Sequence, residues 1–428
     1  MMRILLLAQF YPPIVGGEER HVRNLGAALA QRGHAVTVAT LWYPGAAREE
    51  QDGAVRVLRM RGTLQRAGAL FSDSERRHAP PFPDPELVTQ LAAVMRDVQP
   101  DIVHAHNWIV YAYLPLRPFF PARLVQTLHD YSVVCVRKTM MTEQGACAGP
   151  SFGRCLPCAA RHYGLPVGIV TALAGRASAA AARSCVDRYL AVSRAVAESN
   201  GLGDVAEVVP NFIPDALSEM PVDTPLRPEL PAEPYLLFVG DLNRQKGVPV
   251  LLEAYRRLRA APPLVLIGRS FPETSGPLPA SVRAFHSWPH ADVMGAWRGC
   301  LFGIAPSVWA EPCATVVMEG LAFGKPMVVT DTGGMPDLVQ HAENGLLVPP
   351  GNAGALADAL QRLIDDSELR NRLSAEARRR IPAFTASRVV ERIDAVYARL
   401  AGREGPGAPS TAALQDTRAA TAGSGTQA

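Results

Sequence analysis

The sequence is short of several features that would assign it to a protein class at once. Lysine occurs only at Lys138, Lys246 and Lys325, and 43 basic residues nearly balance 40 acidic ones. The resulting net charge of +3 is too small to predict a nucleic-acid partner. The sequence contains no run of about 18 apolar residues, so it predicts no membrane-spanning helix. The apolar start Met1–Phe10 has no signal-peptide cleavage pattern, so we expect a cytoplasmic protein.

Cysteine is also scarce, with seven residues in a chain of 428, which excludes a disulfide-stabilised scaffold. Four of the seven form a C-x11-C-x7-C-x2-C pattern at Cys135, Cys147, Cys155 and Cys158. Four thiolates with a CxxC pair suit a tetrahedral zinc ion that would hold a loop with little apolar core. An iron–sulfur cluster, free thiols and a redox disulfide remain the alternatives.

A glycine fingerprint for dinucleotides is absent as well. The pair Gly16-Gly17 follows the first apolar run, but GxGxxG does not occur there, and Ala39-Thr40 rather than an acidic residue ends the second apolar run. A dinucleotide-dependent oxidoreductase would need both features. We therefore reject that function.

What the sequence does contain is a long alternation of short apolar runs and helical patterns. Such alternation predicts parallel sheets covered by helices on both faces. A Pro-rich stretch at 210–234 separates two series, which predicts two α/β domains with a ligand in the cleft between them. The expected strands are Arg3–Phe10, Ala35–Thr40, Val55–Met60, Ile102–His106, Leu124–His129 and Tyr189–Ser193, then Tyr235–Gly240, Leu264–Gly268, Val282–His286, Leu301–Pro306 and Met327–Thr330.

Two carboxylates in the second series have a spacing that suits one ligand. Glu311 follows an expected strand and Glu319 lies inside the next helix, so both can reach a ligand that crosses the helix N-terminus. The amides of Ala314, Thr315 and Val316 at that N-terminus can receive a phosphate. The alternative for such a pair alone is two solvated helix charges.

These residues lie in segments that resemble the family 4 retaining glycosyltransferases of the GT-B group. The carrying segments are FYPPIVGGEERHVRNLGAALAQRGHAVTVAT, PDIVHAH, TLHD, FVGDLNRQKGVPVLLEAY, APSVWAEPCATVVMEGLAFGKPMVVTDTGGMPDLV and NGLLVPPGN. The four-cysteine segment after the HD motif and the EPCxTVVxE pattern resemble a subset of that family. The resemblance implies the GT-B fold, in which two Rossmann-like doubly wound domains face a cleft and a C-terminal helix crosses back to the first domain.

On this basis we divide the chain into four parts. Residues 1–215 form an acceptor domain with a Cys-rich insertion at 131–160, and residues 216–382 form the donor domain. Residues 383–402 form the crossover helix. Residues 403–428 contain almost no large apolar side chain and are expected to be a disordered tail.

The resemblance also implies roles for individual residues. Glu319 would hold the donor ribose, Glu311 the donor sugar and Lys246 the diphosphate, while His129 would be the active-site histidine near the transferred sugar. Gly16, Gly17, Gly333 and Gly334 would let backbone approach the diphosphate, although each pair alone is equally typical of a turn. His104 and His106 are expected to be structural.

One departure from the family pattern concerns the donor phosphates. The family commonly has Arg after the Gly of its VGR segment, and this chain has Asp241 there. Arg244 is expected to supply the missing cation. Asp241 also suggests a rival function, a catalytically silent nucleotide-sugar-binding protein, and the cysteines suggest a metal-tethered interaction protein.

The function expected is transfer of a sugar from a UDP- or GDP-sugar to a glycan, a lipid-linked or a small-molecule acceptor, with retention and with no cofactor required for catalysis. A nucleotide-sugar epimerase on the same fold is a further alternative. The Ala-rich stretch Leu165–Ala182, with Arg176 and Arg183, is either a core helix or a surface that rests on the inner face of the cytoplasmic membrane.

Overall fold

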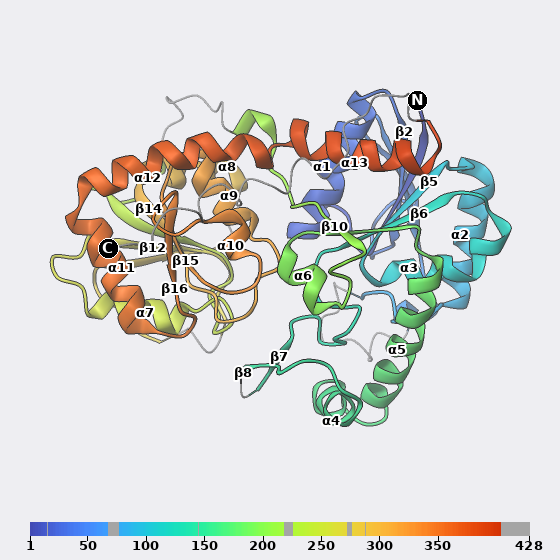
Figure 1. The fold of residues 1–428 in the computed structure, drawn as a ribbon, viewed down its shortest axis with the longest axis horizontal. Coiled ribbons are helices and arrows are strands. Elements are labelled where there is room, and N and C mark those ends of the chain that lie inside the picture. Colours follow the sequence, from blue (N-terminus) through green and yellow to red (C-terminus); the bar gives the residue numbers. More distant parts are fainter. Residues whose placement is uncertain are drawn as a thin grey trace, which may run out of the picture.

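The protein consists of two α/β lobes joined by a long C-terminal helical segment (Figure 1). The computed structural model describes residues 1–14, 16–66, 77–143, 145–217, 226–271, 276–286 and 288–403. Part of the Pro-rich stretch and all but the first residue of the expected tail lie outside these ranges.

The first lobe contains an eight-stranded sheet in the order β10-β9-β6-β5-β1-β2-β4-β3. Its pairs are parallel except β3 with β4, which is antiparallel. The strands are β1 Arg3–Ala8, β2 Ala35–Leu41, β3 Glu49–Asp52, β4 Val55–Met60, β5 Ile102–His106, β6 Arg123–Leu128, β9 Arg188–Ala191 and β10 Ala206–Val208. The covering helices are α1 Gly17–Gln31, α2 Pro85–Val98, α3 Val110–Tyr113, α5 Val167–Cys185 and α6 Arg194–Ser199.

The second lobe contains a six-stranded parallel sheet in the order β13-β12-β11-β14-β15-β16. Its strands are β11 Tyr235–Val239, β12 Leu264–Ile267, β13 Val282–Phe285, β14 Cys300–Ala305, β15 Met327–Thr330 and β16 Gly345–Val348. Its helices are α7 Val248–Arg256, α8 His290–Gly299, α9 Thr315–Ala322, α10 Met335–Leu338, α11 Ala353–Asp365 and α12 Ser367–Arg380. Two parallel sheets with helices on their faces confirm the predicted GT-B architecture.

Side-chain alternation along β1 explains why helices cover both faces of the first sheet. Leu5 and Leu7 point into a core that includes Leu91 of α2, whereas Ile4 and Leu6 point into a core that includes α1. All four of these β1 side chains are fully buried. A strand buried on both faces reads as a continuous apolar run, which is why the sequence located it correctly.

Three strands of the two main sheets are not predicted from the sequence. β3 has the sequence EEQD and lies at the sheet edge, where one face and one side stay in water. β10 is only three residues long. β16 is separated from β15 by α10, which has only four residues, so the usual alternation of strand and long helix is missing there. β3 and β10 have no such apolar run, whereas β16 (GLLV) has a short one that the prediction missed.

The crossover helix is present as predicted. After α12, which lies on the second lobe, the chain passes to α13 (Ala386–Leu400) on the first lobe, where Figure 1 shows it beside α1. Val389, Ile393 and Tyr397 of α13 are buried in the core that contains α1 and one face of β1. The C-terminal segment is thus part of the first lobe's core.

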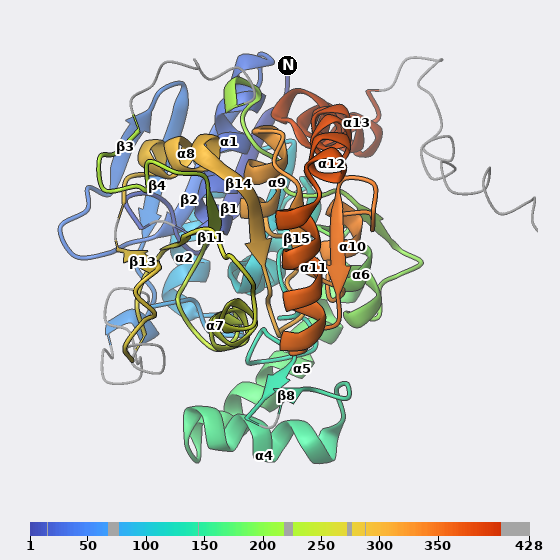
Figure 2. The same cartoon turned by 90° about the vertical axis from the view of Figure 1, so that its left-hand side faces the viewer.

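An insertion between β6 and β9 projects from the body of the first lobe (Figures 1 and 2). It contains the hairpin β7 (Met141–Thr142) and β8 (Gly145–Ala146), the helix α4 (Phe152–Tyr163) and the start of α5. The two helices cross closely, because a Cβ on Gly168 would lie 2.3 Å from the carbonyl oxygen of Ala159. Within the described ranges, no helix is both long and apolar enough to cross a bilayer.

Packing of α13 generates a stability prediction. The Ile393 side chain is 1% exposed, so Ile393→Ala should leave a cavity and lower the free energy of unfolding by about 2–5 kcal/mol. Urea unfolding followed by circular dichroism measures this change. The control is Arg388→Ala on the same helix, whose side chain is 72% exposed. Equal midpoints for both variants would contradict the packing of α13 against the first lobe.

Candidate active site

The carboxylate of Glu311 lies in the loop between β14 and α9 and is buried. Its Oε1 accepts hydrogen bonds from Ser307 Oγ (3.2 Å) and Trp309 Nε1 (3.0 Å), and Lys246 Nζ forms an ion pair with the same oxygen. Among the described residues, these donors all bind Oε1. Within the described part of the chain, Oε2 thus accepts none of these hydrogen bonds.

Lys246 reaches Glu311 because its loop packs tightly on the end of β14. Gly247 has a φ of +76°, and a Cβ there would lie 1.9 Å from the carbonyl oxygen of Pro306. The Lys246 amide also donates to Asn243 Oδ1 at 2.8 Å. The family resemblance implies that Lys246 holds the diphosphate and Glu311 the sugar, and the structure brings these two side chains into direct contact.

Glu319, inside α9, is 4% exposed and contacts two basic side chains from different segments. His290 Nε2 lies 2.8 Å from its Oε1, and Arg20 Nη1 lies 3.7 Å from the same oxygen. Arg20 belongs to α1 of the first lobe and lies three residues after Gly17. An ion pair therefore spans the two lobes at Glu319, with partners that the sequence analysis missed.

The N-terminus of α9 faces the same region. Ala314 is its N-cap and makes no side-chain capping bond. Thr315 and Val316 are half-buried, whereas the residues on either side of them are buried. The first-turn amides of this helix are thus positioned to meet a ligand anion.

The glycine pairs have different surroundings. A Cβ on Gly333 would lie 2.3 Å from the Glu311 carbonyl oxygen, and one on Gly334 would lie 2.1 Å from that of Pro312. The pair therefore lets the loop after β15 pack on the loop that carries Glu311. Gly17 has no atom within 4 Å of a Cβ position, while at Gly16 the nearest atom belongs to the flexible side chain of Glu19.

The cation expected beside Asp241 comes from a residue that the sequence analysis did not consider. Arg269, after β12, pairs with Asp241 through Nε–Oδ1 (2.9 Å) and Nη2–Oδ2 (2.8 Å). Arg244 is exposed and, among the described residues, lies within 4.0 Å of no carboxylate. A guanidinium is therefore held at the Asp241 loop by a bidentate pair, and Arg244 remains a second candidate.

His129 follows β6 on the first lobe and belongs to a buried histidine cluster. His129 Nε2 and His106 Nδ1 share a hydrogen bond of 2.8 Å, and the two rings stack. His21 packs edge-on against His129. One ring nitrogen from each of His21, His106 and His129 lies within 4.8 Å of the other two, as a shared metal ion would require. His104 bonds to Tyr397 and Thr127, which supports its expected structural role.

Two contacts place His129 opposite Glu311. Asn211 lies beside His129, and its Nδ2 donates to the Cys313 carbonyl at 3.3 Å. Tyr131, two residues after His129, donates its hydroxyl to the Ala310 carbonyl at 2.9 Å. The structure therefore brings His129 to the loop that carries Glu311, although the two come from different lobes.

Burial keeps the histidine cluster uncharged at neutral pH. It lowers the pKa of His129 to about 4, against the opposing effect of Asp130, Glu19 and Asn211. Burial also lowers the pKa of His104 to about 3 and that of His78 to about 4, and the pKa values of His21 and His106 are lowered as well. His129 is therefore a neutral hydrogen-bonding group at neutral pH.

This cluster predicts loss of stability in mild acid. Below about pH 6.5 the unfolded chain binds protons at these histidines while the folded chain does not, and each such site removes about 1.4 kcal/mol per pH unit. The melting temperature should therefore fall between pH 6.5 and 4.5, and scanning calorimetry measures it. A melting temperature that stays constant over this interval would refute the assignment of buried neutral histidines.

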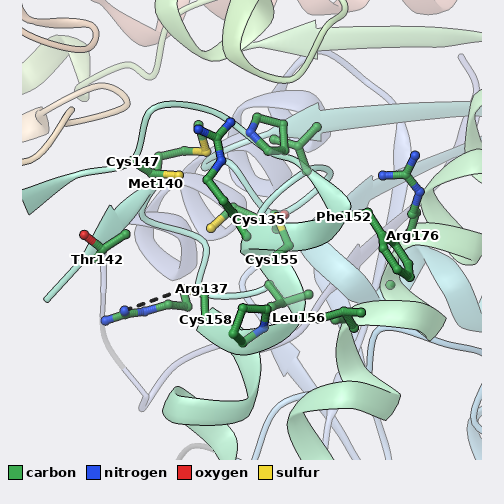
Figure 3. Close-up of a pocket in the computed structure, with 18 of the residues that line it drawn as sticks. Cys135, Arg137, Met140, Thr142, Cys147, Phe152, Cys155, Leu156, Cys158 and Arg176 are labelled. Carbon is green, nitrogen blue, oxygen red and sulfur yellow. Dashed lines mark hydrogen bonds between the residues drawn. The ribbon is translucent and has the colours of Figure 1, made fainter. Parts of the chain in front are cut away.

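The four predicted metal ligands lie together in the insertion but do not form a closed site. Cys135, Cys147, Cys155 and Cys158 line one cavity (Figure 3). Among the described residues, no three of their sulfur atoms lie within 4.8 Å of one another. Backbone amides of Arg137, Lys138 and Met140 do approach the Cys135 sulfur and oppose the effect of burial, which raises its pKa. The zinc site stays a prediction.

Comparison with known proteins agrees with this geometry. The model "Glycosyltransferase Family 4" matches residues 15–217 and "Glycosyl transferases group 1" matches residues 227–380. A glycogen synthase of Mycobacterium tuberculosis is 26% identical over 89% of this chain and 90% of its own length. A D-inositol 3-phosphate glycosyltransferase of Pseudarthrobacter chlorophenolicus is 26% identical over 92% and 94%.

Solved structures show the same fold at lower identity. Sucrose-phosphate synthase of Thermosynechococcus elongatus superimposes with a TM-score of 0.70 at 22% identity, covering 94% of this chain and all of that one. Anabaena HepE in complex with UDP superimposes with a TM-score of 0.64 at 17% identity, covering 93% of this chain and all of that one.

Proposed function

Because this chain is a GT-B glycosyltransferase of the family 4 type, we propose that it moves a sugar from a UDP- or GDP-sugar to an acceptor hydroxyl with retention of anomeric configuration. The contact between Lys246 and Glu311, opposite His129, carries this proposal. It joins a cation for phosphate to a carboxylate for sugar hydroxyls at one point of the cleft.

In the proposed reaction the bond between the sugar C1 and the diphosphate oxygen breaks, and the acceptor oxygen bonds to C1 on the same face. The electron pair leaves with the nucleoside diphosphate, whose phosphate oxygen takes the acceptor proton. Lys246, a guanidinium at the Asp241 loop and the amides of α9 stabilise the developing charge without a metal. The remaining contacts position the donor.

Within this proposal each buried group has one task. Glu311 holds sugar hydroxyls through Oε2, and neutral His129 donates to or accepts from the sugar. Glu319 holds the ribose, and on donor binding the ribose hydroxyls would take over the place of Arg20, whose side chain is 47% exposed. Arg269 neutralises Asp241 through a bidentate pair, so Asp241 does not repel the donor phosphates, and the turnover measurement separates an enzyme from a silent binder.

A panel of UDP- and GDP-sugars, each incubated with the purified protein, is the donor panel that tests this function. We expect release of UDP or GDP from one sugar donor in the presence of acceptor extract, and a loss of about 10²–10³-fold in Glu311→Gln because its stabilising contact is removed. Glu253→Gln, an exposed carboxylate on α7, is the matched control. The anomeric form of the product, read by NMR, tests retention. Unchanged turnover in Glu311→Gln would sink the assignment of the site.

Acceptor class is proposed from relatives that differ among themselves. The relatives include a glycogen synthase, a D-inositol 3-phosphate glycosyltransferase and, over 48% of this chain at 30% identity, a phosphatidyl-myo-inositol mannosyltransferase of Mycobacterium leprae. We favour a lipid-linked acceptor with contact at a membrane surface. The support is α5, whose Val167, Ile169, Val170 and Leu173 are exposed although a core helix would bury them.

The zinc proposal has its own test. Protein purified from zinc-containing medium should contain about one equivalent of zinc, as one CxxC-containing four-thiolate site would bind. Cys155→Ser with Cys158→Ser should lose it, and Cys185→Ser outside the cluster should keep it. Mass spectrometry of the gel-filtered protein measures the metal. Equal metal content in all three proteins would exclude these cysteines as ligands.

A further inference from the structure

The insertion encloses a cavity of about 930 Å³ that the donor site does not use. We call it the insertion cavity; it lies between the loop 132–158 and the helix α5 (Figure 3). Its charged lining is one-sided. Glu143 is its one acidic lining residue, whereas five arginines line it: Arg137, Arg154, Arg161, Arg176 and Arg183.

Carboxylates do not balance these arginines. Among the described residues, no Asp or Glu lies within 4.0 Å of any of the five. Other arginines of the chain, such as Arg23, Arg117 and Arg269, do pair with a carboxylate. Their hydrogen-bond acceptors are neutral: Arg154 donates to Ser151 Oγ and Arg183 to the Asn200 carbonyl, both at 3.0 Å. The sequence from position 144 to 186 contains no acidic residue at all.

Arg137 shows the imbalance most clearly. It is half-buried, and its Nε is buried without a hydrogen-bond partner. Its Nη1 makes only a long contact of 3.9 Å to the Cys158 sulfur. A guanidinium in this position is stabilised by an oxyanion, and phosphate oxygens match its planar donors.

The rest of the lining is apolar, which narrows the class of anion. Val133, Val136, Met140, Leu156 and Leu173 contribute to the walls. Phe152 and Leu173 belong both to the lining and to the exposed surface, where they are 59% and 46% exposed. Apolar surface thus continues from the cavity to the outside of α4 and α5. A ligand with a phosphate and an apolar chain satisfies both parts.

The wall of the cavity begins three residues after His129 in the chain. Ser132 lines it, and the Ser132 amide donates to Asp130 Oδ1 at 2.8 Å. Asp130 follows His129 and also accepts from Asn107 Nδ2 at 3.2 Å. Two residues of chain span at most about 7 Å, so Ser132 in the cavity wall lies within about 7 Å of Asp130, the residue that follows His129.

We propose that the insertion cavity binds the phosphate or diphosphate of an amphiphilic, lipid-linked acceptor and directs its hydroxyl toward His129. This inference rests on the proposed function for the identity of the acceptor, but the cavity itself is a binding site that a binding measurement detects without turnover. The arginines hold the phosphate, and the exposed apolar side of α4 and α5 takes the chain.

The experiment is isothermal titration of the full chain with geranyl diphosphate, inorganic pyrophosphate and geraniol. We expect geranyl diphosphate to bind most tightly, pyrophosphate at least about tenfold more weakly because it lacks the chain, and geraniol not at all. Binding should persist in Lys246→Ala, which separates the insertion cavity from the donor diphosphate site. Failure of the donor panel with retained geranyl diphosphate binding would reject the proposed function and leave the cavity site intact.

Matched variants identify the residues. Arg137→Gln with Arg176→Gln should weaken geranyl diphosphate binding at least about tenfold, whereas Arg256→Gln with Arg388→Gln, both on exposed helix surfaces, should not. Circular dichroism establishes that each variant folds. Equal affinity in both double variants would overturn the proposal. So would equal affinity for pyrophosphate and geranyl diphosphate, which indicates a free-phosphate site, or binding to phosphatidylglycerol vesicles without binding of geranyl diphosphate.

Discussion

The donor side of the cleft depends on how closely three loops approach one another around the backbone of Glu311. The amide of Gly334 donates to the Glu311 carbonyl at 2.7 Å, so the loop after β15 is fastened to the loop after β14. Gly247 brings the loop after β11 against Pro306 from the other side. No side chain fits at either glycine. This crowding fixes the Glu311 side chain beside Lys246 before any ligand is present, which is how positioning reduces the cost of binding.

Contacts between the lobes combine a permanent part with an exchangeable part. An apolar cluster continues from Tyr131 and Val192 of the first lobe to Ala314 and Val317 of the second. Beside it, the ion pair of Arg20 with Glu319 is partly exposed and contributes at most about 1 kcal/mol. A donor can displace that pair without disturbing the apolar contact. Apolar burial therefore holds the two lobes together, while the Arg20–Glu319 ion pair beside it can be exchanged for contacts with a ligand.

The sequence predicted those parts of the molecule that depend on local pattern. The buried parallel strands are continuous apolar runs, so β1 and β15 were found within two residues of their ends. The relative placement of two residues within one segment, such as Glu311 and Glu319, can also be predicted from their spacing. The edge strand β3 could not be found, because its EEQD sequence has no apolar face.

Pairings between distant segments were beyond the sequence for a different reason. Arg269 pairs with Asp241 because β11 and β12 are neighbours in the sheet, so that the loops after them meet. Arg20 and His290 likewise reach Glu319 from segments far away in the chain. No periodicity or spacing encodes such pairs, since they follow from the order of strands and the packing of the lobes. The exposure of one face of α5 likewise depends on which elements pack against this helix, because its composition alone suits a core helix.

The balance of charge differs between the two sides of the cleft, and this difference gives each side its ligand. On the donor side Glu311, Glu319 and Asp241 each have a cationic partner, so the site is nearly neutral before the donor arrives. In the insertion the arginines have no carboxylate partners among the described residues. Four of these arginines are exposed to water, whereas Arg137 is half-buried and its Nε is a buried donor without a partner among the described residues, which is costly until an acceptor joins it. The protein therefore has room for one more anion at the insertion, and an acceptor that carries a phosphate would supply it.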